Sequence, residues 1–588
     1  MHFLTSLGSG LVAALWMGGL WYAAPLLGGR RPADRLRDAL TLGVLLPFGL
    51  GLLHALTGAL CGLGLVILCT LRRRRLPKAD SPSRGGDDVA IWALPLLVTI
   101  AVAWPALVRP PLEGDTLAYH LPNAAAWVQS GSLWTTTTRY WWYPGGSELF
   151  AAGLLAVAGP FSLLFAGAAP VALVGMRLAT WGRALGLAPL TAGALGAAVC
   201  SAYVIALQAG SLENDVWLGA FFLELLWAGL YERRASTQAV AVCSLLKPDG
   251  FVYALLALVA SRRLEIAGWL PFVVWVARDA ILWDHALLPP SATRYPLWET
   301  TVVAHGLDGV SLLARALVLD GPMTLLLFVG GVTGLFVLRD RRLLVAAIGA
   351  LVLFWVLPMG FTGSTPQLAT GHSLRFLIPF FCVCGIGLAA LAVRVPRAAP
   401  YLAWALAASG IARITAVYWN DAHTRTSLFV LALTAALLIF SKRTLRPRLL
   451  AATFACAVVA AVATAGWAPA AYYDDWLGQR PREPHLFAWL RAACPARVVT
   501  YDLRLGSIDT ICPATETIDG WDRHACAQAR AERALLISGP YEPGERSAFL
   551  LHRRETLRCG RLLFANGAAV VVDPPPSSFG GLTRPVRP

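Results

Sequence analysis

Long apolar runs alternate with short basic or polar segments along most of the chain. The first run covers residues 11–28, and such runs recur as far as Trp467. Many are near the roughly 20 residues that a helix needs to cross a bilayer, which favours helical spans over a barrel of alternating strands. From run lengths and Arg-bearing breaks we expect an α-helical polytopic membrane protein with about 11–14 transmembrane helices.

The second apolar run, residues 41–70, does not fit a single span. As a helix it would be about 45 Å long, which is more than one crossing and less than two. Basic clusters at both flanks, residues 30–37 and 72–75, look cytoplasmic. Either the run is a re-entrant hairpin around Pro47 and Gly51, or one basic cluster departs from the positive-inside rule.

Two acidic segments are predicted to lie on the same side of the membrane. A span over residues 91–108 leaves the cytoplasm and delivers a polar, aromatic loop that starts near Glu113. The next spans return inward and then lead out again to residues 211–215, Ser-Leu-Glu-Asn-Asp. Both segments therefore face the extracytoplasmic side, because a basic loop separates each outward passage from the next.

Further polar segments interrupt the later apolar runs. Lys247-Pro248-Asp249-Gly250 predicts a break between two helices, since Pro removes a backbone donor and Gly ends or kinks a helix. Residues 283–320 are mixed and predict a second loop or an interfacial helix. Residues 361–375 form another polar loop between two spans.

From about Pro469 the chain changes character, with frequent Arg, Asp, Glu and Pro. Short β-rich runs predict strands at residues 497–502, 534–538, 548–552 and 568–573, and a helix is predicted at residues 483–493. This pattern is typical of a small soluble α/β domain. Its four cysteines, Cys494, Cys512, Cys526 and Cys559, permit one or two disulfides in an oxidising compartment, with the pairing left open.

These patterns divide the chain into four parts. We expect residues 1–88 to hold the N-terminal apolar segments and a cytoplasmic linker, and residues 89–468 to form the main transmembrane domain with its first extracytoplasmic loop at 109–148. Residues 469–573 are expected to form the extracytoplasmic α/β domain, and residues 574–588 a tail.

Composition agrees with a membrane protein and removes one class of partner. The chain has 588 residues, of which 57% are hydrophobic and 14% charged, with a mean hydropathy of +0.60. The net charge of +15 comes from Lys and Arg clusters between apolar runs. This is the distribution of cytoplasmic loops, so we expect the lipid bilayer as a partner and no nucleic acid.

The first extracytoplasmic loop carries the candidate chemistry. Asp115 follows a glycine a few residues beyond a span, and Tyr119 and His120 would share roughly one face of a helix with it. Acids are costly near a bilayer and are often functional when present. The alternative is that Glu113 and Asp115 only cap the helix that begins near Thr116.

These motifs, taken in order, resemble GT-C fold glycosyltransferases. The residues that carry the resemblance are Asp115, Tyr119-His120, Trp127, Gly131-Ser132-Leu133, Tyr143-Pro144-Gly145-Gly146-Ser147-Glu148-Leu149, Glu213-Asn214-Asp215, Lys247-Pro248-Asp249-Gly250 and Arg375-Phe376-Leu377-Ile378-Pro379. The similarity is to the branch with bacterial polyprenyl-phosphate-sugar transferases, such as the aminoarabinose transferases of lipid A, and protein O-mannosyltransferases. It covers roughly residues 90–395, and the chain differs in having extra apolar segments before them.

The resemblance implies an inverting sugar transfer from a polyprenyl-phosphate donor. Asp115 would be the catalytic base, and Asp215 the second acid. Charge stabilisation of the departing phosphate needs cations, for which the candidates are Arg375, His120, Arg139 and Lys247. Glu113 and Tyr119 complete the substrate-binding candidates.

Each candidate has a plainer alternative. Arg375 could be a positive-inside anchor, Lys247 could pair with Asp249 at a cytoplasmic turn, and Asp215 could cap the helix from Val216. The aromatic cluster, Trp134 and residues 140–143, either seats the loop in the headgroups or stacks on sugar.

The resemblance also sets the expected surroundings. The acceptor would be a lipid, a glycan or a protein, and the active site would face outward from the plasma (inner) membrane. Two carboxylates and a His could hold a divalent cation, but the branch resembled is not generally metal-dependent, so we expect no metal and no cofactor. The rival function is a transporter or flippase of lipid-linked intermediates, with the acids as substrate or proton sites.

Overall fold

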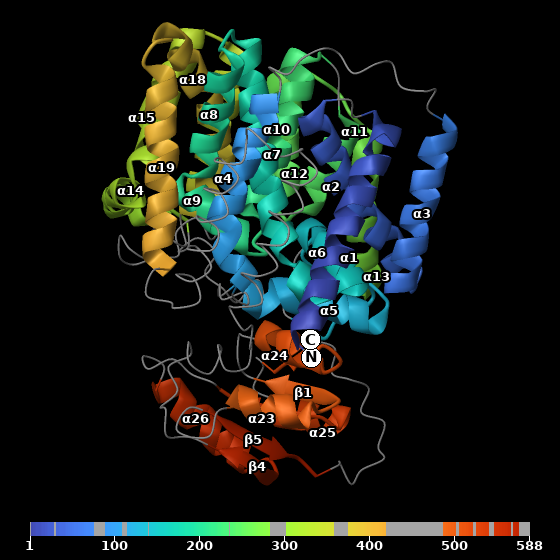
Figure 1. Cartoon of the computed structure of the whole chain (residues 1–588). Helices are drawn as coiled ribbons and strands as arrows, with labels where there is room; N and C mark the ends of the chain where they lie inside the picture. The colour runs from blue at the N-terminus through green and yellow to red at the C-terminus, as the bar shows by residue number, and fades with distance from the viewer. Residues whose placement is uncertain are drawn as a thin grey trace.

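The computed structural model shows a helical bundle with a small α/β domain at one end (Figure 1). The structure describes residues 2–28, 31–75, 89–108, 115–138, 140–233, 236–282, 301–357, 374–418, 486–500, 505–520, 525–539, 546–565 and 569–575. Within these ranges the chain is mostly helical, and strands occur in the C-terminal part.

The helices of the bundle are α1 (His2–Ala23), α2 (Pro32–Leu52), α3 (Gly58–Arg75), α4 (Val89–Val108), α5 (Leu121–Ser130), α6 (Gly146–Ala158), α7 (Leu164–Ala184), α8 (Pro189–Cys200), α9 (Tyr203–Ala206), α10 (Asp215–Leu226), α11 (Thr237–Leu245), α12 (Gly250–Ser261), α13 (Leu270–Leu282), α14 (Gly306–Asp320), α15 (Pro322–Leu338), α16 (Arg341–Val356), α18 (Ile378–Arg394) and α19 (Ala399–Tyr418). Short turns of other helix types occur at their ends. The two that concern the site are η3 (Thr116–His120) and η11 (Leu374–Leu377).

Two of the described helices are by themselves long and apolar enough to cross a bilayer, Gly8–Leu27 and Leu374–Arg394. Two bent pairs qualify when each is taken as one span: Pro189–Cys200 with Tyr203–Gly210, bent by 72°, and Val303–Asp320 with Pro322–Leu338, bent by 118°. The larger number of spans expected from the sequence stays a prediction. The sharp bend at Gly321 sets α14 across the direction of α15, as an interfacial helix requires.

The second apolar run folds as a helical hairpin, but its turn is not at Pro47 and Gly51. Both residues lie inside α2, and the chain turns between Leu52 and Gly58. The helix starts as early as Pro32, because Pro is well suited to a first helical position. The basic stretch at residues 35–37 is therefore part of a helix and not a loop.

Arg37 is buried in an ionic cluster that we call the Arg177 cluster. Its members come from α2, α7 and α10: Asp34, Arg37, Asp38, Arg177 and Glu224. Arg177 lies 2.6 Å from both Asp34 and Glu224. No side chain of the cluster is more than 9% exposed. The cluster joins the N-terminal helices to the rest of the bundle.

The break at Lys247-Pro248-Asp249-Gly250 is confirmed. α11 ends at Leu245, and α12 begins at Gly250. A Cβ atom at Gly250 would collide with the backbone oxygen of Cys243, so only glycine allows the two helices to approach here.

The C-terminal domain has one five-stranded sheet in the order β2-β1-β3-β5-β4. Its elements are α23 (Leu486–Ala493), β1 (Arg497–Thr500), α24 (Leu505–Ile511), β2 (Glu516–Asp519), α25 (Ala525–Glu532), β3 (Leu535–Ser538), α26 (Arg546–Leu557), β4 (Arg561–Ala565) and β5 (Val570–Asp573). Strand β1 pairs in parallel with β2 and β3, whereas β5 is antiparallel to β3 and β4. The helix α24 lies between the sheet and the bundle (Figure 1).

Sequence patterns found three of these strands and the first helix. The predicted strand at residues 548–552 is wrong, because this stretch lies in α26, which packs on β3 and β5. A short apolar run can belong to a helix or to a strand, and a five-residue window does not distinguish the two. The strands β2 and β4 were missed. The four cysteines form two disulfides, Cys494–Cys512 and Cys526–Cys559.

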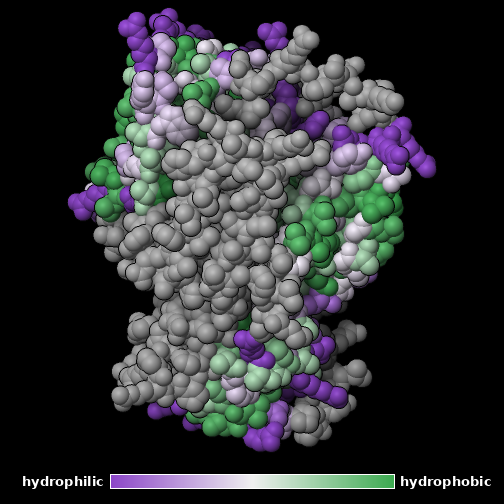
Figure 2. Space-filling model, viewed as in Figure 1, coloured by the Kyte–Doolittle hydropathy of each residue, from purple (hydrophilic) through white to green (hydrophobic). Residues whose placement is uncertain are grey.

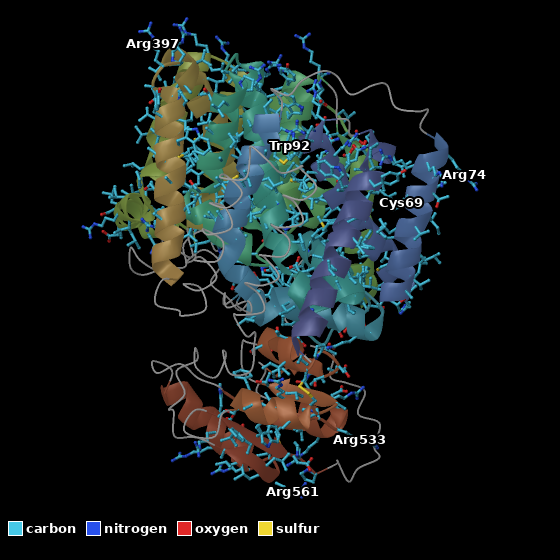
Figure 3. All side chains as sticks on the ribbon, viewed as in Figure 1. Cys69, Arg74, Trp92, Arg397, Arg533 and Arg561 are labelled. Atoms are coloured by element: carbon cyan, nitrogen blue, oxygen red, sulfur yellow. A yellow bond between two sulfur atoms is a disulfide. The ribbon has the colours of Figure 1, made fainter. Side chains whose placement is uncertain are left out.

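The surface of the bundle is apolar on its flank and polar at its ends. Figure 2 shows apolar side chains gathered over the flank that carries α3, where Leu63, Val66 and Ile67 are at least half exposed. Figure 3 places Arg397 at the end of the bundle away from the C-terminal domain, and Arg74 on the flank near the end of α3. This arrangement suits a bundle seated in a lipid bilayer with its basic residues at one interface.

Candidate active site

Asp115 stands directly before a single π-helical turn, η3. The turn is closed by a hydrogen bond from the backbone N–H of Leu121 to the carbonyl of Thr116. Such turns are rare and occur frequently at functional sites. Asp115 is at the N-cap position, but its side chain makes no capping hydrogen bond. The Asp115 carboxylate therefore does not act as a side-chain cap of this turn.

Arg375 brings the two predicted acidic segments together. Its guanidinium, in η11, forms ion pairs with Asp115 through Nη2 and with Glu213 through Nη1, and its Nε lies 3.5 Å from Asp215 Oδ2. We call Asp115, Glu213, Asp215, Lys247, Asp249 and Arg375 the Arg375 cluster. Arg375 is thus a partner of carboxylates within the site, which is more than an interfacial anchor does.

Lys247 belongs to the same cluster. Its Nζ atom lies 2.6 Å from Asp215 Oδ1 and 3.6 Å from Asp249 Oδ2, and 4.8 Å from the centre of the Phe376 ring. The pairing with Asp249 is therefore real, but it occurs beside Asp215 and Arg375. Asp215, in the first turn of α10, uses its carboxylate for these two cations.

Asp115 is the most exposed acid of the cluster. Its side chain is 35% exposed and that of Asp249 is 24% exposed, whereas the side chains of Arg375 and Glu213 are each 8% exposed. Glu213 lies between η5 (Leu207–Gly210) and α10, where burial raises its pKa, aided by Asp115 and Asp215 and opposed by Arg375. A substrate entering the site would meet Asp115 before it met the buried groups.

His120 has a buried carboxylate as its partner. Its Nδ1 atom lies 2.6 Å from Glu148 Oε1, and Ser147 Oγ donates to Glu148 Oε2 at 2.8 Å. The Tyr119 ring lies 4.1 Å from the imidazole, centre to centre. His120 therefore belongs to the shell that supports η3, with Glu148 in the first turn of α6 holding the ring in one orientation.

The aromatic cluster packs largely on itself and on α13. The ring centre of Tyr140 lies 4.8 Å from that of Tyr143 and 4.9 Å from that of Tyr119, so these rings form one wall beside η3. Trp141 is buried, with the Arg278 guanidinium 5.4 Å from its ring centre. These contacts fix the loop to the bundle. Whether the rings also meet sugar or headgroups stays a prediction.

Two candidates, Glu113 and Arg139, lie outside the described residues. In the part of the chain that the structure describes, no group of three or more His, Cys, Asp or Glu side chains is arranged to hold a metal ion. Where three carboxylates do converge, the Arg375 guanidinium stands among them and supplies the positive charge.

Comparisons with known proteins give a likeness of fold only. No family model matches the chain, and no curated protein matches it by sequence. Two crystal structures of ArnT from Cupriavidus metallidurans are similar in structure. The form bound to undecaprenyl phosphate has 15% identity and a TM-score of 0.44, over 82% of this chain and 98% of that chain. The apo form has 15% identity and a TM-score of 0.43, over 82% and 97%.

The matched protein is of the kind that the sequence motifs resemble. Because identity and TM-score are both low, this likeness assigns neither an activity nor a role to any residue. Those are argued from the side chains of the Arg375 cluster alone.

Sequence patterns did not identify three buried partners of the site residues: Glu148, Glu213 and Gln208. Glu148 was read only as part of a motif, although an acid in the first turn of an apolar helix was a visible signal. Glu213 was noted beside Asp215 but not assigned a role. Gln208, which donates to Glu213 Oε2 at 2.5 Å, left no signal in the sequence.

Proposed function

We propose that the chain is a GT-C type inverting glycosyltransferase. It would move a sugar from a polyprenyl-phosphate donor to a lipid, glycan or protein acceptor at the extracytoplasmic face of the plasma (inner) membrane. The observation that supports this most is the convergence of Asp115, Glu213 and Asp215 on Arg375. Three distant segments meet there, and one of the acids is accessible.

In this proposal Asp115 is the general base. It takes the proton of an acceptor hydroxyl or amine while the acceptor atom attacks the anomeric carbon. The bond from that carbon to the phosphate oxygen breaks, and its electron pair leaves with the polyprenyl phosphate. Attack from the side opposite the phosphate inverts the anomeric centre.

The ion pairs suggest how the base is released. Arg375 is already engaged by carboxylates, and Lys247 by Asp215 and Asp249. A donor phosphate must therefore compete for these cations. Asp115 is the most exposed of Arg375's partners, so it is the carboxylate that a phosphate displaces most easily. Donor binding would then free Asp115 to accept a proton, while Arg375 stabilises the departing phosphate.

A transporter or flippase of lipid-linked intermediates is the second candidate. One observation favours it: the Arg177 cluster buries five ionisable side chains within α2, α7 and α10. Buried ionisable groups mark ion or substrate pathways in many transporters. Two cations in contact with three acids can also hold helices together without binding a substrate. The full burial of the Arg177 cluster supports this structural role.

The deciding experiment uses the full chain in lipid vesicles that contain a radiolabelled polyprenyl-phosphate sugar and a mixture of lipid, glycan and peptide acceptors. The transferase releases free polyprenyl phosphate and forms a product of the opposite anomeric configuration. If the donor crosses between leaflets while no polyprenyl phosphate is released, the chain is a flippase and the proposal is wrong.

A further inference from the structure

The C-terminal domain docks on the segment that follows Asp115. The helix α24 packs against both η3 and α5. A Cβ atom at Gly506 would lie 3.1 Å from Leu117 Cα, 3.2 Å from the Leu117 carbonyl oxygen and 3.1 Å from Leu121 Cδ2. The backbones of α24 and η3 are therefore in direct contact, and Leu117 is fully buried beneath α24.

Two further contacts fix the same face of the domain. Gln129, in α5, donates through Nε2 to the carbonyls of Pro513 and Thr515 at 3.0 and 2.9 Å. The backbone N–H of Asp519, at the end of β2, donates to the carbonyl of Thr137 at 3.0 Å. The domain is thus held at three places, Leu117, Gln129 and Thr137, and these contacts resist both sliding and rotation of the domain over residues 117–137.

The opposite side of η3 faces the second acidic segment. Thr116 Oγ1 accepts a hydrogen bond from the backbone N–H of Leu212 at 3.1 Å, next to Glu213. The π-helical turn therefore stands between α24 and the acids of the Arg375 cluster. Because a π turn holds one more residue than an α turn, its relaxation to α-helix would rotate the residues before it by about 100° and shift them by about 1.5 Å.

We propose that α24 is a positioning element of the active site: it holds η3 in its π-helical turn and so keeps Asp115 on Arg375. Gly506 is the positioning residue, because any side chain there pushes on the Leu117 backbone, two residues from Asp115. This inference rests on the proposed transferase function. It extends that function by making the C-terminal domain part of the catalytic apparatus.

A disulfide bond stabilises the domain at this interface. Cys512 follows α24 and is joined to Cys494, which follows α23. The second disulfide, Cys526–Cys559, joins the start of α25 to the turn that follows α26. Only the first bridge connects directly to α24. The two bridges are therefore a matched pair for separating the docking of α24 from the stability of the domain.

The first test compares Gly506→Val with Gly520→Ala in the full chain in vesicles. Gly520 packs within the domain: a Cβ atom there would lie 2.8 Å from Val499 Cγ1, 2.9 Å from Ala525 Cβ and 3.0 Å from the Thr500 carbonyl oxygen. A 1 Å displacement of a catalytic group costs about 10²-fold in rate. We expect Gly506→Val to lower kcat by about 10²-fold with the donor KM within about twofold, and Gly520→Ala to lower thermal stability with kcat retained.

Hydrogen exchange separates this inference from the proposed function. In Gly506→Val the backbone amides of residues 116–121 should exchange faster than in the wild type. An unchanged kcat in a folded Gly506→Val protein overturns the positioning claim and leaves the transferase standing. If the wild type transfers no sugar, the transferase fails, and unchanged exchange at residues 116–121 then overturns the positioning claim on its own evidence.

The disulfides provide the second test, which does not depend on accommodating a valine. Replacing Cys494 and Cys512 by Ser should lower kcat and speed exchange at residues 116–121. Replacing Cys526 and Cys559 by Ser should lower the unfolding temperature of the domain without changing either quantity. Equal loss of kcat in both double variants would mean that only domain stability matters, which contradicts a positioning role for α24.

Discussion

Helix α10 contributes one acid to each of the two ionic clusters. The clusters differ in how exposed their side chains are and in the elements that supply them. Asp215 starts the helix in the Arg375 cluster, and Glu224 lies about 14 Å further along it in the Arg177 cluster. The Arg177 cluster is wholly enclosed by three helices. The Arg375 cluster is built mainly from helix ends and connections, and Asp115 in it is 35% exposed.

This difference separates a structural clamp from a working site. Buried charges whose partners are all protein groups fix the register of helices, and breaking one pair leaves an uncompensated charge. A cluster with an accessible member can exchange a partner for a ligand. We therefore propose that the Arg177 cluster holds α2 on the bundle and that the Arg375 cluster is the site of the proposed transfer reaction.

The largest effect on stability is expected from Glu224→Gln. The change removes one of the two carboxylates that Arg177 and Arg37 share and should lower the free energy of unfolding by about 3–5 kcal/mol. Thermal unfolding in detergent measures it. The control is Asp340→Asn, which breaks an exposed pair with Arg342 and should cost less than about 1 kcal/mol. A stable Glu224→Gln protein that no longer moves lipid would instead favour the transporter.

Arg375→Ala is expected to lower transfer by about 10²–10³-fold, since it removes both the proposed contact to the donor phosphate and the partner of three acids. Arg375→Lys keeps the charge but lacks the planar guanidinium that can donate to two carboxylates at once. It should recover the stability of the protein but only part of the rate of transfer. Arg397→Ala, at the other end of the bundle, is the matched control and should transfer normally. Normal transfer by Arg375→Ala would remove this cluster from the mechanism.

A smaller effect, dependent on pH, is expected at Asp509. This residue is buried in α24, accepts a hydrogen bond from Thr517 Oγ1 at 3.0 Å, and has its pKa raised well above the ordinary 3.8 by burial. The folded chain then keeps a proton that the unfolded chain has lost, so stability falls as pH rises from about 4 through the folded pKa.

Asp509→Asn should abolish that fall. Relative to the wild type it should stabilise the C-terminal domain by about 1–2 kcal/mol at pH 8, with little difference near pH 4. Thermal unfolding of the full chain across this pH range is the measurement. A stability difference that does not change with pH would show that Asp509 does not titrate in this way.

Local signals in the sequence predicted the features that depend on few residues. The break at Lys247-Pro248-Asp249-Gly250 follows from Pro and Gly chemistry, and the strands β1, β3 and β5 follow from short β-branched runs. Counting spans predicted that Asp115 and Asp215 lie on the same side of the membrane, and in the structure both carboxylates lie at Arg375.

Features that depend on tertiary contacts left no such signal. Arg37 stands in a basic stretch typical of a loop, and its burial is explained by its ion pairs with Asp34, Asp38 and Glu224. The π-helical turn at residues 116–120 is held by contacts with Gly506 and Leu212, which are remote in sequence. Glu148, the partner of His120, belongs to one of the sequence motifs, but only the folded structure shows that the two side chains pair.

The most direct test of the central claim is sugar transfer by Asp115→Asn in vesicles supplied with the polyprenyl-phosphate donor. Asparagine keeps the size of the side chain and can still accept a hydrogen bond from Arg375, but it cannot take up the acceptor's proton. We predict a folded protein of unchanged unfolding temperature in which transfer is lost. Transfer at the wild-type rate by this variant would contradict the assignment of Asp115 as the catalytic base.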